Sequence, residues 1–145
     1  MHDRGMTVEA IHLGKEDVPD LWTVEDVVAV AGKGLEGDRH FHDAGAPAGQ
    51  AITLVEAEVV EDAGLAPGET RRQVTVRGVR LNELVGKRFR VGEVECVGIE
   101  LCEPCSHLES MTRPGIVKEL VHRAGINADV VVGGTIRVGD AVVEL

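Results

Sequence analysis

The chain has 145 residues, of which 43% are hydrophobic and 28% charged, with two Phe, one Trp and no Tyr. This composition is that of a soluble globular domain with an aliphatic core, and it excludes a disordered chain. The formal net charge of −10 repels DNA, RNA and anionic lipid, so we expect neither a nucleic-acid partner nor a membrane partner.

The N-terminus and the cysteines both indicate a cytoplasmic protein. The first residues, MHDRGMTVEA, lack the basic stretch and apolar run of a signal peptide. Cys96, Cys102 and Cys105 crowd into ten positions, unlike the cysteines of a secreted disulfide framework. At this length one domain over residues 1–145 is expected.

The first third of the chain predicts strands followed by a long loop. Residues 7–14 are rich in β-forming side chains, and residues 24–32 predict a second strand that glycines end. A glycine-punctuated loop over 32–49 follows, and loops of that length are usually functional or disordered.

The next segment, QAITLVE (50–56), predicts a strand that runs into a short helix. Thr53 and Glu56 have the spacing of a capping box, and Gly64 is a natural stop. The helix would therefore span about three turns at most.

Two β-hairpins are predicted in the second half of the chain. The first covers 87–101, with its turn at Gly92-Glu93, and the second covers 135–145, with its turn at Gly139-Asp140. Strands near both termini, short hairpins and few helices predict a mainly β fold, a β-barrel with a few short helices.

Two short helices are expected between these hairpins. Pro104 could occupy the first helical position of one, with Leu108 and Met111 facing inward. The other covers 116–125, where Ile116, Leu120 and Val121 form an apolar stripe.

The Cys-x-x-Cys in ELCEPCSHLE (100–109) is the first candidate site. If the helix begins at Pro104, Cys105 lies in its first turn, where the helix dipole stabilises a thiolate. A redox dithiol and a zinc site with Cys96 or the nearby histidines are alternatives, but no repeated βαβ pattern and no second ligand pair support them. Cys96 itself is expected to pack as a small hydrophobic residue.

The loop sequence GKGLEGDRH (32–40) is the second candidate site. Its glycines permit close backbone approach, and Arg39 could hold a phosphate or carboxylate bidentately. The loop is neither a Walker A motif nor a dinucleotide fingerprint. The alternative is an ordinary surface pair between Arg39 and Asp38.

A third cluster lies in LVHRAGIN (120–127), which contains His122, Arg123 and Asn127. The first two could simply be cations at a helix C-terminus. Alternatively, Arg123 could join Arg39 in an anion-binding pocket.

Taken together, the ordered segments resemble the MOSC domain, the family named for the C-terminal domain of molybdenum cofactor sulfurases. The resemblance runs from about Val24 to the C-terminus and is carried by GLEGDRHF, QAITLVEAE, VRGVRLNELVGKRFRVGEVECVGIELCEPCSHLE and IRVGD. It implies a MOSC-type β-barrel and a stand-alone MOSC protein.

The resemblance also implies roles for particular residues. In the family, the cysteine of the Pro-Cys-x-x-Leu element, here Cys105, either carries a sulfane sulfur as a persulfide or ligates molybdenum. The Gly-Asp-Arg-His element, here Gly37 to His40, is expected to line the same cleft, with Arg39 near the phosphate of a pterin cofactor.

The chain also departs from the family's larger members. It is too short for the pyridoxal-phosphate-dependent desulfurase domain of the sulfurases, so no pyridoxal phosphate is expected, and a persulfide would come from a separate cysteine desulfurase or other donor. We likewise expect no counterpart of the N-terminal β-barrel domain of the amidoxime-reducing relatives. A molybdoenzyme or an electron donor is a further candidate partner.

The resulting hypothesis is a protein of molybdenum cofactor binding or sulfur transfer, either a sulfur carrier or a component of a molybdenum-dependent reductase. Cys105 acts as the thiolate or as the molybdenum ligand, and His40 or His107 moves protons. The cofactor-binding set is Gly37, Asp38, Arg39, His122, Arg123 and Asn127. The alternative is a non-catalytic module that binds a cofactor or a protein, with a passive cysteine.

Overall fold

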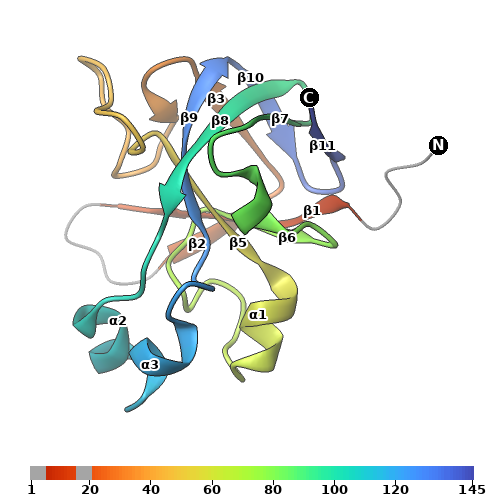
Figure 1. The fold of residues 1–145 in the computed structure, drawn as a ribbon. Helices are drawn as coiled ribbons and strands as arrows, with labels where there is room; N and C mark the ends of the chain where they lie inside the picture. Colours follow the sequence, from red (N-terminus) through yellow and green to blue (C-terminus); the bar gives the residue numbers. More distant parts are fainter. Residues whose placement is uncertain (1–5, 16–20) are drawn as a thin grey trace.

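Short strands make up most of the computed structural model, which describes residues 6–15 and 21–145 (Figure 1). In chain order the described strands are β1 (Thr7–Gly14), β2 (Leu21–Val24), β3 (Asp26–Val30), β4 (Gly34–Leu35), β5 (Ile52–Glu56), β6 (Val74–Arg77), β7 (Arg88–Val91), β8 (Val94–Leu101), β9 (Ile126–Val132), β10 (Gly134–Arg137) and β11 (Val142–Glu144). Between them lie α1 (Ala57–Asp62), the 3₁₀ turn η1 (Leu81–Leu84), α2 (Ser106–Met111) and α3 (Ile116–Leu120). The predicted mainly β class with a few short helices is confirmed.

Two sheets organise these strands around one main core. The larger sheet has the order β11-β7-β8-β9-β5-β6-β1-β2, and β10, β3 and β4 form the smaller one. Side chains alternate between the faces of a strand, and β7 follows this period, with Phe89 and Val91 buried while Arg88 and Arg90 are exposed. Phe89 is the one aromatic residue among the fully buried side chains of that core, and the rest are mainly aliphatic.

The closed barrel predicted from the sequence is not confirmed. Within the described residues, the edge strands β11 and β2 do not pair with each other. The start of β1 is joined to the chain around β11 by one isolated bridge, Thr7 to Ala141, and by backbone hydrogen bonds from Val142 to Met6, from Val8 to Asp140 and from Gly139 to Val8. This link is too short to form a ladder between strands.

One predicted hairpin is right and the other is wrong. β7 and β8 pair antiparallel around the turn at Gly92-Glu93, as expected. The arms of the 135–145 segment do not pair with each other, because β10 pairs with β3 and β11 with β7. The start of β1 lies against the turn instead, since the Val8 N–H donates to the Asp140 carbonyl.

Helix α1 connects two parallel strands, β5 and β6, so the fold contains a βαβ unit that the sequence analysis did not detect. The predicted capping box is wrong, because the residue preceding α1 is Glu56 and no side chain caps the helix. Thr53 lies inside β5, where its hydroxyl accepts a hydrogen bond from the Gln73 N–H at 2.9 Å. Because the Gln73 N–H occupies the Thr53 hydroxyl, this hydroxyl does not cap a helix.

Helices α2 and α3 are shorter than predicted. α2 begins at Ser106, after Cys105, so Pro104 precedes the helix instead of starting it. Leu108, Ile116 and Leu120 are buried in a second hydrophobic cluster, as the apolar pattern predicted. Met111 and Val121 are exposed, because the helices end at or before them.

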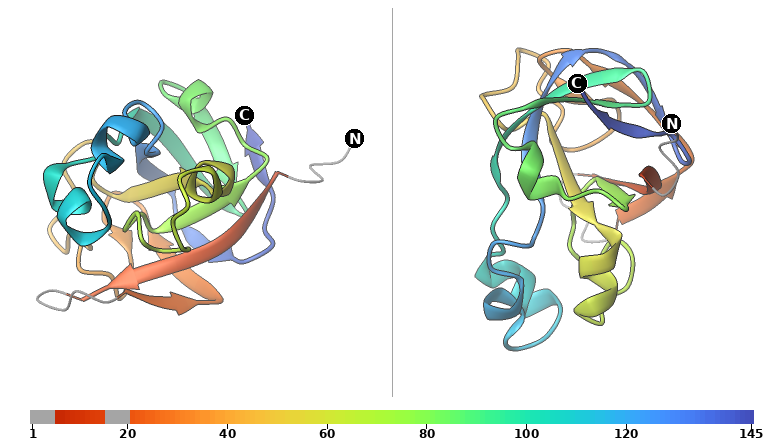
Figure 2. Two further views of the ribbon diagram at one scale, coloured as in Figure 1. Left: turned by 90° about the horizontal axis from the view of Figure 1, so that it is seen from below. Right: turned by 45° about the vertical axis from the view of Figure 1, so that its right-hand side comes forward.

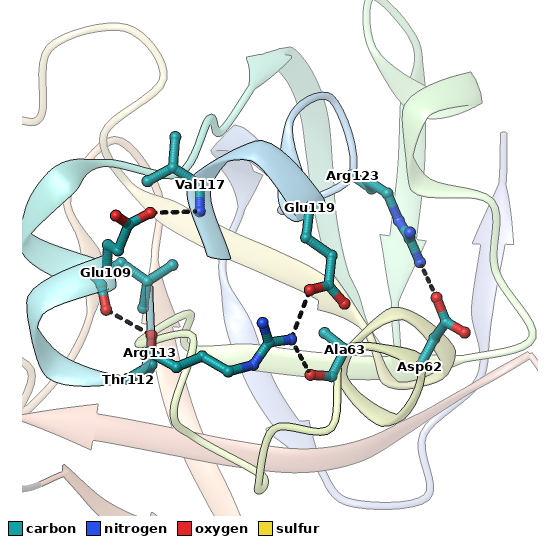
Figure 3. A network of polar contacts seen from close by, with 9 residues as sticks. Asp62, Ala63, Glu109, Thr112, Arg113, Val117, Glu119 and Arg123 are labelled. Atoms are coloured by element: carbon teal, nitrogen blue, oxygen red, sulfur yellow. Dashed lines mark hydrogen bonds and ion pairs between the residues drawn. The ribbon is translucent and has the colours of Figure 1, made fainter. Parts of the chain in front are cut away.

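All three helices gather at one end of the molecule, below the strands in Figure 1 and in the right-hand view of Figure 2. Figure 3 shows the polar contacts that join them. Arg113, between α2 and α3, donates to the carbonyl of Ala63 after α1 and to the Glu119 carboxylate, at 2.7 and 2.6 Å. Glu109 of α2 accepts the Val117 N–H of α3. Polar contacts and a shared apolar cluster therefore hold the three helices together, next to the segment that contains Cys102 and Cys105.

Gly125 is required where α3 returns into β9. Its φ is +104°, and an added Cβ would lie 2.0 Å from the Leu54 carbonyl oxygen. Gly64 also has a positive φ, +71°, but nothing lies within 4 Å of its missing Cβ. A substitution at either glycine would strain the backbone, but only a substitution at Gly125 would also cause a steric clash.

We predict that Gly125→Ala lowers the free energy of unfolding by about 3 kcal/mol or more, because the backbone of β5 must move. Gly64→Ala should cost only about 1–2 kcal/mol, the penalty of a left-handed backbone. Urea unfolding of both variants measures the difference. Equal losses would contradict the close approach of Gly125 to β5.

Candidate functional site

A buried carboxylate fixes the loop that carries the Gly-Asp-Arg-His element. Asp38 is 7% exposed. One of its oxygens accepts the Gly14 N–H at 2.8 Å, and the other accepts the His40 N–H at 3.0 Å and the Gln73 side-chain amide at 2.7 Å. The alternative of a surface pair with Arg39 is therefore wrong: Asp38 is an internal acceptor that joins the loop to the end of β1 and the start of β6.

Gln73 extends this network to β5. Its side-chain oxygen accepts the Thr53 N–H at 2.8 Å while its own N–H donates to the Thr53 hydroxyl. A cleft of about 320 Å³ opens beside these residues, lined by His40, His42, Gly49, Gln50, Thr53, Gln73, Glu100 and Asn127. The structure thus brings together His40 and Asn127, two site residues predicted from distant segments.

His40 and Arg39 form a polar pair at this cleft. The Arg39 Nε–H donates to Nε2 of His40 at 3.1 Å, so that nitrogen is the acceptor of a neutral imidazole. Desolvation lowers the pKa of His40, and the cations Arg39 and Arg71 act in the same direction, whereas Asp38 opposes them. The Arg39 guanidinium lies over Gly14, whose added Cβ would be 3.1 Å from its Nη1.

Arg72 fixes the backbone of the segment that contains Cys102 and Cys105. Its Nη2 donates to the carbonyls of Cys102 and Glu103 at 3.1 and 3.4 Å, and its Nε donates to the Ala124 carbonyl at 2.9 Å. The Cys102 N–H donates to the Gly125 carbonyl at 2.8 Å. A rigid planar donor therefore holds the chain where β8 leaves the sheet, beside the loop that returns to β9.

The three cysteines differ in exposure. Cys96 is fully buried, and burial raises its pKa to about 12, as expected of an inert core thiol. Cys102 is half-buried, and burial raises its pKa too, although the positive charge of Arg72 opposes this. Cys105 is exposed, immediately before α2.

A β-bulge lies in β8 between Cys96 and the end of the strand. Cys96 pairs with Val130 on the core face, and the register shifts between Gly98 and Glu100. After the shift Glu100 pairs with Asn127, and both line the cleft. Cys102 follows the end of β8, two residues beyond Glu100.

Glu103, between the two cysteines, binds His122. One carboxylate oxygen accepts the His122 N–H at 2.7 Å and the other lies 2.6 Å from its Nδ1. His122 has a φ of +62°, a conformation that costs energy in a residue other than glycine. Its hydrogen bonds lower the pKa of Glu103. His122, which follows α3, therefore supports the segment that contains Cys102 and Cys105. It does not line the cleft.

Three further predicted site residues lie away from the cleft. Arg123 binds Asp62 of α1 at 2.7 Å (Figure 3), so it and Arg39 have different partners. His107 is exposed on α2, where its carbonyl accepts the Ser110 hydroxyl. Gly37 is exposed with a φ of +84° and serves the turn that precedes Asp38.

Sequence reasoning missed the residues that organise the site, Arg72 and Gln73, and the nearby Arg71. They are consecutive in RRQ (71–73), directly before β6. Two arginines and a glutamine between a Pro-Gly break and an apolar strand were the available signal.

A second hollow of about 270 Å³ lies between β1, the 67–71 loop and the end of α2, and His12 lines it. His12 is 6% exposed, and its Nδ1 has no hydrogen-bond partner within the described residues. Burial lowers the pKa of this imidazole.

The described residues contain no group of three or more His, Cys, Asp or Glu side chains placed to hold a metal ion. The zinc alternative therefore has no ligand set in that part of the chain. In the described ranges, no helix has the length and apolar character that crossing a membrane requires.

Comparisons with known proteins agree with this architecture. The YUAD protein from Bacillus subtilis superimposes with a TM-score of 0.77 at 19% identity, over 93% of this chain and 92% of that one. YiiM from Geobacillus stearothermophilus gives 0.70 at 18% identity over 96% and 74%, and YiiM from Escherichia coli gives 0.66 at 16% over 97% and 70%. At such identities the likeness shows the fold alone.

The sequence itself identifies the family. The model of the MOSC domain matches residues 39–143, from Arg39 to Val143, which is most of the chain. The protein therefore belongs to the MOSC domain family, and a general role related to the molybdenum cofactor follows from that membership. No curated protein is significantly similar in sequence.

We predict that Asp38→Ala costs about 3–5 kcal/mol of stability, because it leaves buried donors of Gly14 and Gln73 without an acceptor. Asp43→Ala, in the same loop but exposed, should change stability by less than about 0.5 kcal/mol. Thermal and urea unfolding test both. A small effect of Asp38→Ala would refute the central role of this carboxylate.

His12 should make the protein less stable in acid. Its pKa in the folded state is lowered, so the unfolded chain binds more protons as the pH falls through about 6.5. The stability contributed by neutral His12 is present above that pH and is lost as the pH falls toward the folded pKa. Urea unfolding at about pH 8 and about pH 5 should show a smaller acid loss in His12→Leu than in the wild type. An unchanged loss would contradict this assignment.

Proposed function

We propose that this MOSC-domain protein acts in molybdenum cofactor binding or sulfur transfer, with Cys105 as its working thiol. The observation that carries the proposal is the exposure of Cys105, which is exposed where Cys102 is half-buried and Cys96 buried. A thiolate must meet its reactant directly, whether it accepts sulfane sulfur or ligates a metal. Cys96 is closed to both reactions by burial.

The surroundings of Cys105 support the same assignment. Arg72 holds the two carbonyls that precede Pro104, so the backbone before the thiol is fixed. His40 is held at the cleft as a neutral imidazole whose Nε2 accepts the Arg39 N–H, so it would take up a proton only when Arg39 releases that nitrogen. His107, on the first turn of α2, is the second candidate for proton transfer. Both histidines keep these proton-transfer roles in the proposal.

The donor set also fits the pterin-bound molybdenum that the family implies. A thiol is a ligand type for soft metals, a guanidinium is suited to a phosphate, and an amide and an imidazole suit the polar edge of a pterin. Cys105 would hold molybdenum and Arg39 the phosphate, with His40 and Asn127 lining the cleft. The bound metal would supply two-electron redox chemistry, and the chain would supply position and protons.

Partners follow from this proposal. Sulfur would come to Cys105 from a separate cysteine desulfurase or another sulfane donor. Sulfur or cofactor would then pass to a molybdoenzyme, or electrons would come from a donor protein. The exposed position of Cys105 is what such an encounter requires, since the donor's sulfur must reach it.

A non-catalytic binding module with a passive cysteine is the second candidate, and one observation favours it. α2 has six residues and begins after Cys105, whose side chain makes no capping hydrogen bond. The helix therefore gives the thiolate less help than the sequence predicted. Fast and selective alkylation of Cys105 below about pH 7 would favour the working thiol over this module.

We predict that incubation with a cysteine desulfurase and cysteine adds one sulfur atom to the wild type, because the exposed thiolate attacks the donor persulfide. Intact-mass analysis at the earliest times after mixing, before any release of sulfur, should show this gain in the wild type and in Cys102→Ala and no gain in Cys105→Ala. Cys96→Ala, which alters a buried thiol, is the matched control and should load normally. Loading that survives Cys105→Ala would show that another residue carries the sulfur.

A further inference from the structure

We propose that Cys102 is the thiol that releases sulfur from Cys105: it attacks the Cys105 persulfide, forms a Cys102–Cys105 disulfide and frees hydrosulfide. This inference rests on the proposed function, because it needs a persulfide on Cys105. It adds a second catalytic residue and a defined product. The two thiols lie on one short segment and differ in their exposure to solvent.

Both cysteines lie on a segment whose backbone is fixed at each end. At the first end, the Cys102 N–H is bound to Gly125 and its carbonyl to Arg72. At the other end, the Cys105 carbonyl accepts the Glu109 N–H of α2 at 3.3 Å. Glu103, between the cysteines, is held by His122 through both carboxylate oxygens. Few movements are left to the segment, and a Cys-x-x-Cys spacing suits a reversible disulfide.

Cys102 lies three positions before Cys105 on this fixed segment, and Arg72 binds its carbonyl. Burial raises the pKa of Cys102. Arg72 acts in the opposite direction and favours the Cys102 thiolate. The guanidinium that fixes the backbone of Cys102 thus also helps it to ionise.

Unequal burial sets the order of the two steps. Cys105 is exposed and meets the donor first, whereas Cys102 is half-buried and therefore less accessible to an incoming protein. A thiol with a raised pKa is seldom ionised, but its thiolate is the stronger nucleophile once formed. Cys102 is therefore poorly suited to receive sulfur from a donor and well suited to an intramolecular attack.

The reaction balances without an external oxidant. The Cys102 thiolate attacks the inner sulfur of the Cys105 persulfide, the new S–S bond joins the two residues, and the bond to the outer sulfur breaks. The outer sulfur leaves as hydrosulfide with the electron pair of that bond. The protein sulfurs are oxidised to a disulfide as the sulfane sulfur is reduced. A dithiol reductant then restores both thiols by exchange.

The test follows loading and release under anaerobic conditions, with inorganic polysulfide as the sulfur source. Intact mass, sulfide in solution and peptide mapping of the 102–105 link are measured for the wild type, Cys102→Ser, Cys105→Ser and Cys96→Ala. We expect the wild type and Cys96→Ala to release sulfide and to end two hydrogens lighter than the dithiol form. Cys102→Ser should keep the added sulfur, and its sulfide release should fall to that of unloaded protein.

The outcomes separate this inference from the proposed function. If the wild type and Cys102→Ser hold the added sulfur equally long, Cys105 is a carrier but Cys102 does not release the sulfur. If Cys102→Ser gains no sulfur, Cys105 is not a carrier and both proposals fail. A disulfide that also forms in polysulfide-free controls, without sulfide release, would overturn the release step. Circular dichroism of each variant checks that the fold is retained.

Discussion

The site depends on a single buried anion, the Asp38 carboxylate. Burying a charge is unfavourable unless hydrogen bonds replace its hydration, and here three donors do so, two from backbone and one from Gln73. Because those donors belong to different segments, they meet only when the glycine loop, the end of β1 and the start of β6 are all in place. The carboxylate therefore couples the formation of the cleft wall to the folding of the sheet.

The dipeptide Arg72-Gln73 carries this coupling across to the cysteines. Gln73 binds Asp38 and β5, while Arg72 binds the carbonyls of Cys102, Glu103 and Ala124. The two side chains bind different segments of the chain, so two neighbouring residues serve the two halves of the site. A shift of one residue in the approach to β6 would disconnect both halves at once. The position of the thiols is thus linked to the glycine loop through one short segment.

Much of the fold could be predicted because local patterns dictate it. The period of two in β7, the glycine turn at 92–93 and the apolar spacing around Ile116 and Leu120 all produced the expected elements. What failed depends on distant partners. Thr53 looks like a helix cap until Gln73 occupies its hydroxyl, and the arms at 135–145 look like a hairpin until β3 and β7 pair with them. Propensity and spacing do not describe competition for one acceptor or one strand edge.

The residue types of the candidate site could be predicted from the sequence, but the partners that each residue binds could not. Asp38, Arg39 and His40 were selected together, yet the buried acceptor proved to be Asp38, and the arginine that positions the thiols proved to be Arg72. Arg123 looked like a partner for Arg39 because both are cationic near loops, whereas Asp62 on α1 neutralises it. An arginine's role is set by which carboxylates and carbonyls the fold brings near it, and a single sequence does not show that.

The clearest example is the fate of the cysteines in and after β8. Cys96 lies within β8, where it is fully buried and pairs with Val130. The extra residue at the Gly98/Glu100 bulge turns Glu100 to the cleft, and Gly98 is needed there because an added Cβ would lie 2.2 Å from the Leu84 carbonyl oxygen. Cys102 follows the end of β8, where the chain leaves the sheet, and it is half-buried with its carbonyl bound by Arg72. The end of the strand, more than the Cys-x-x-Cys spacing, therefore separates the second cysteine from the inert core thiol.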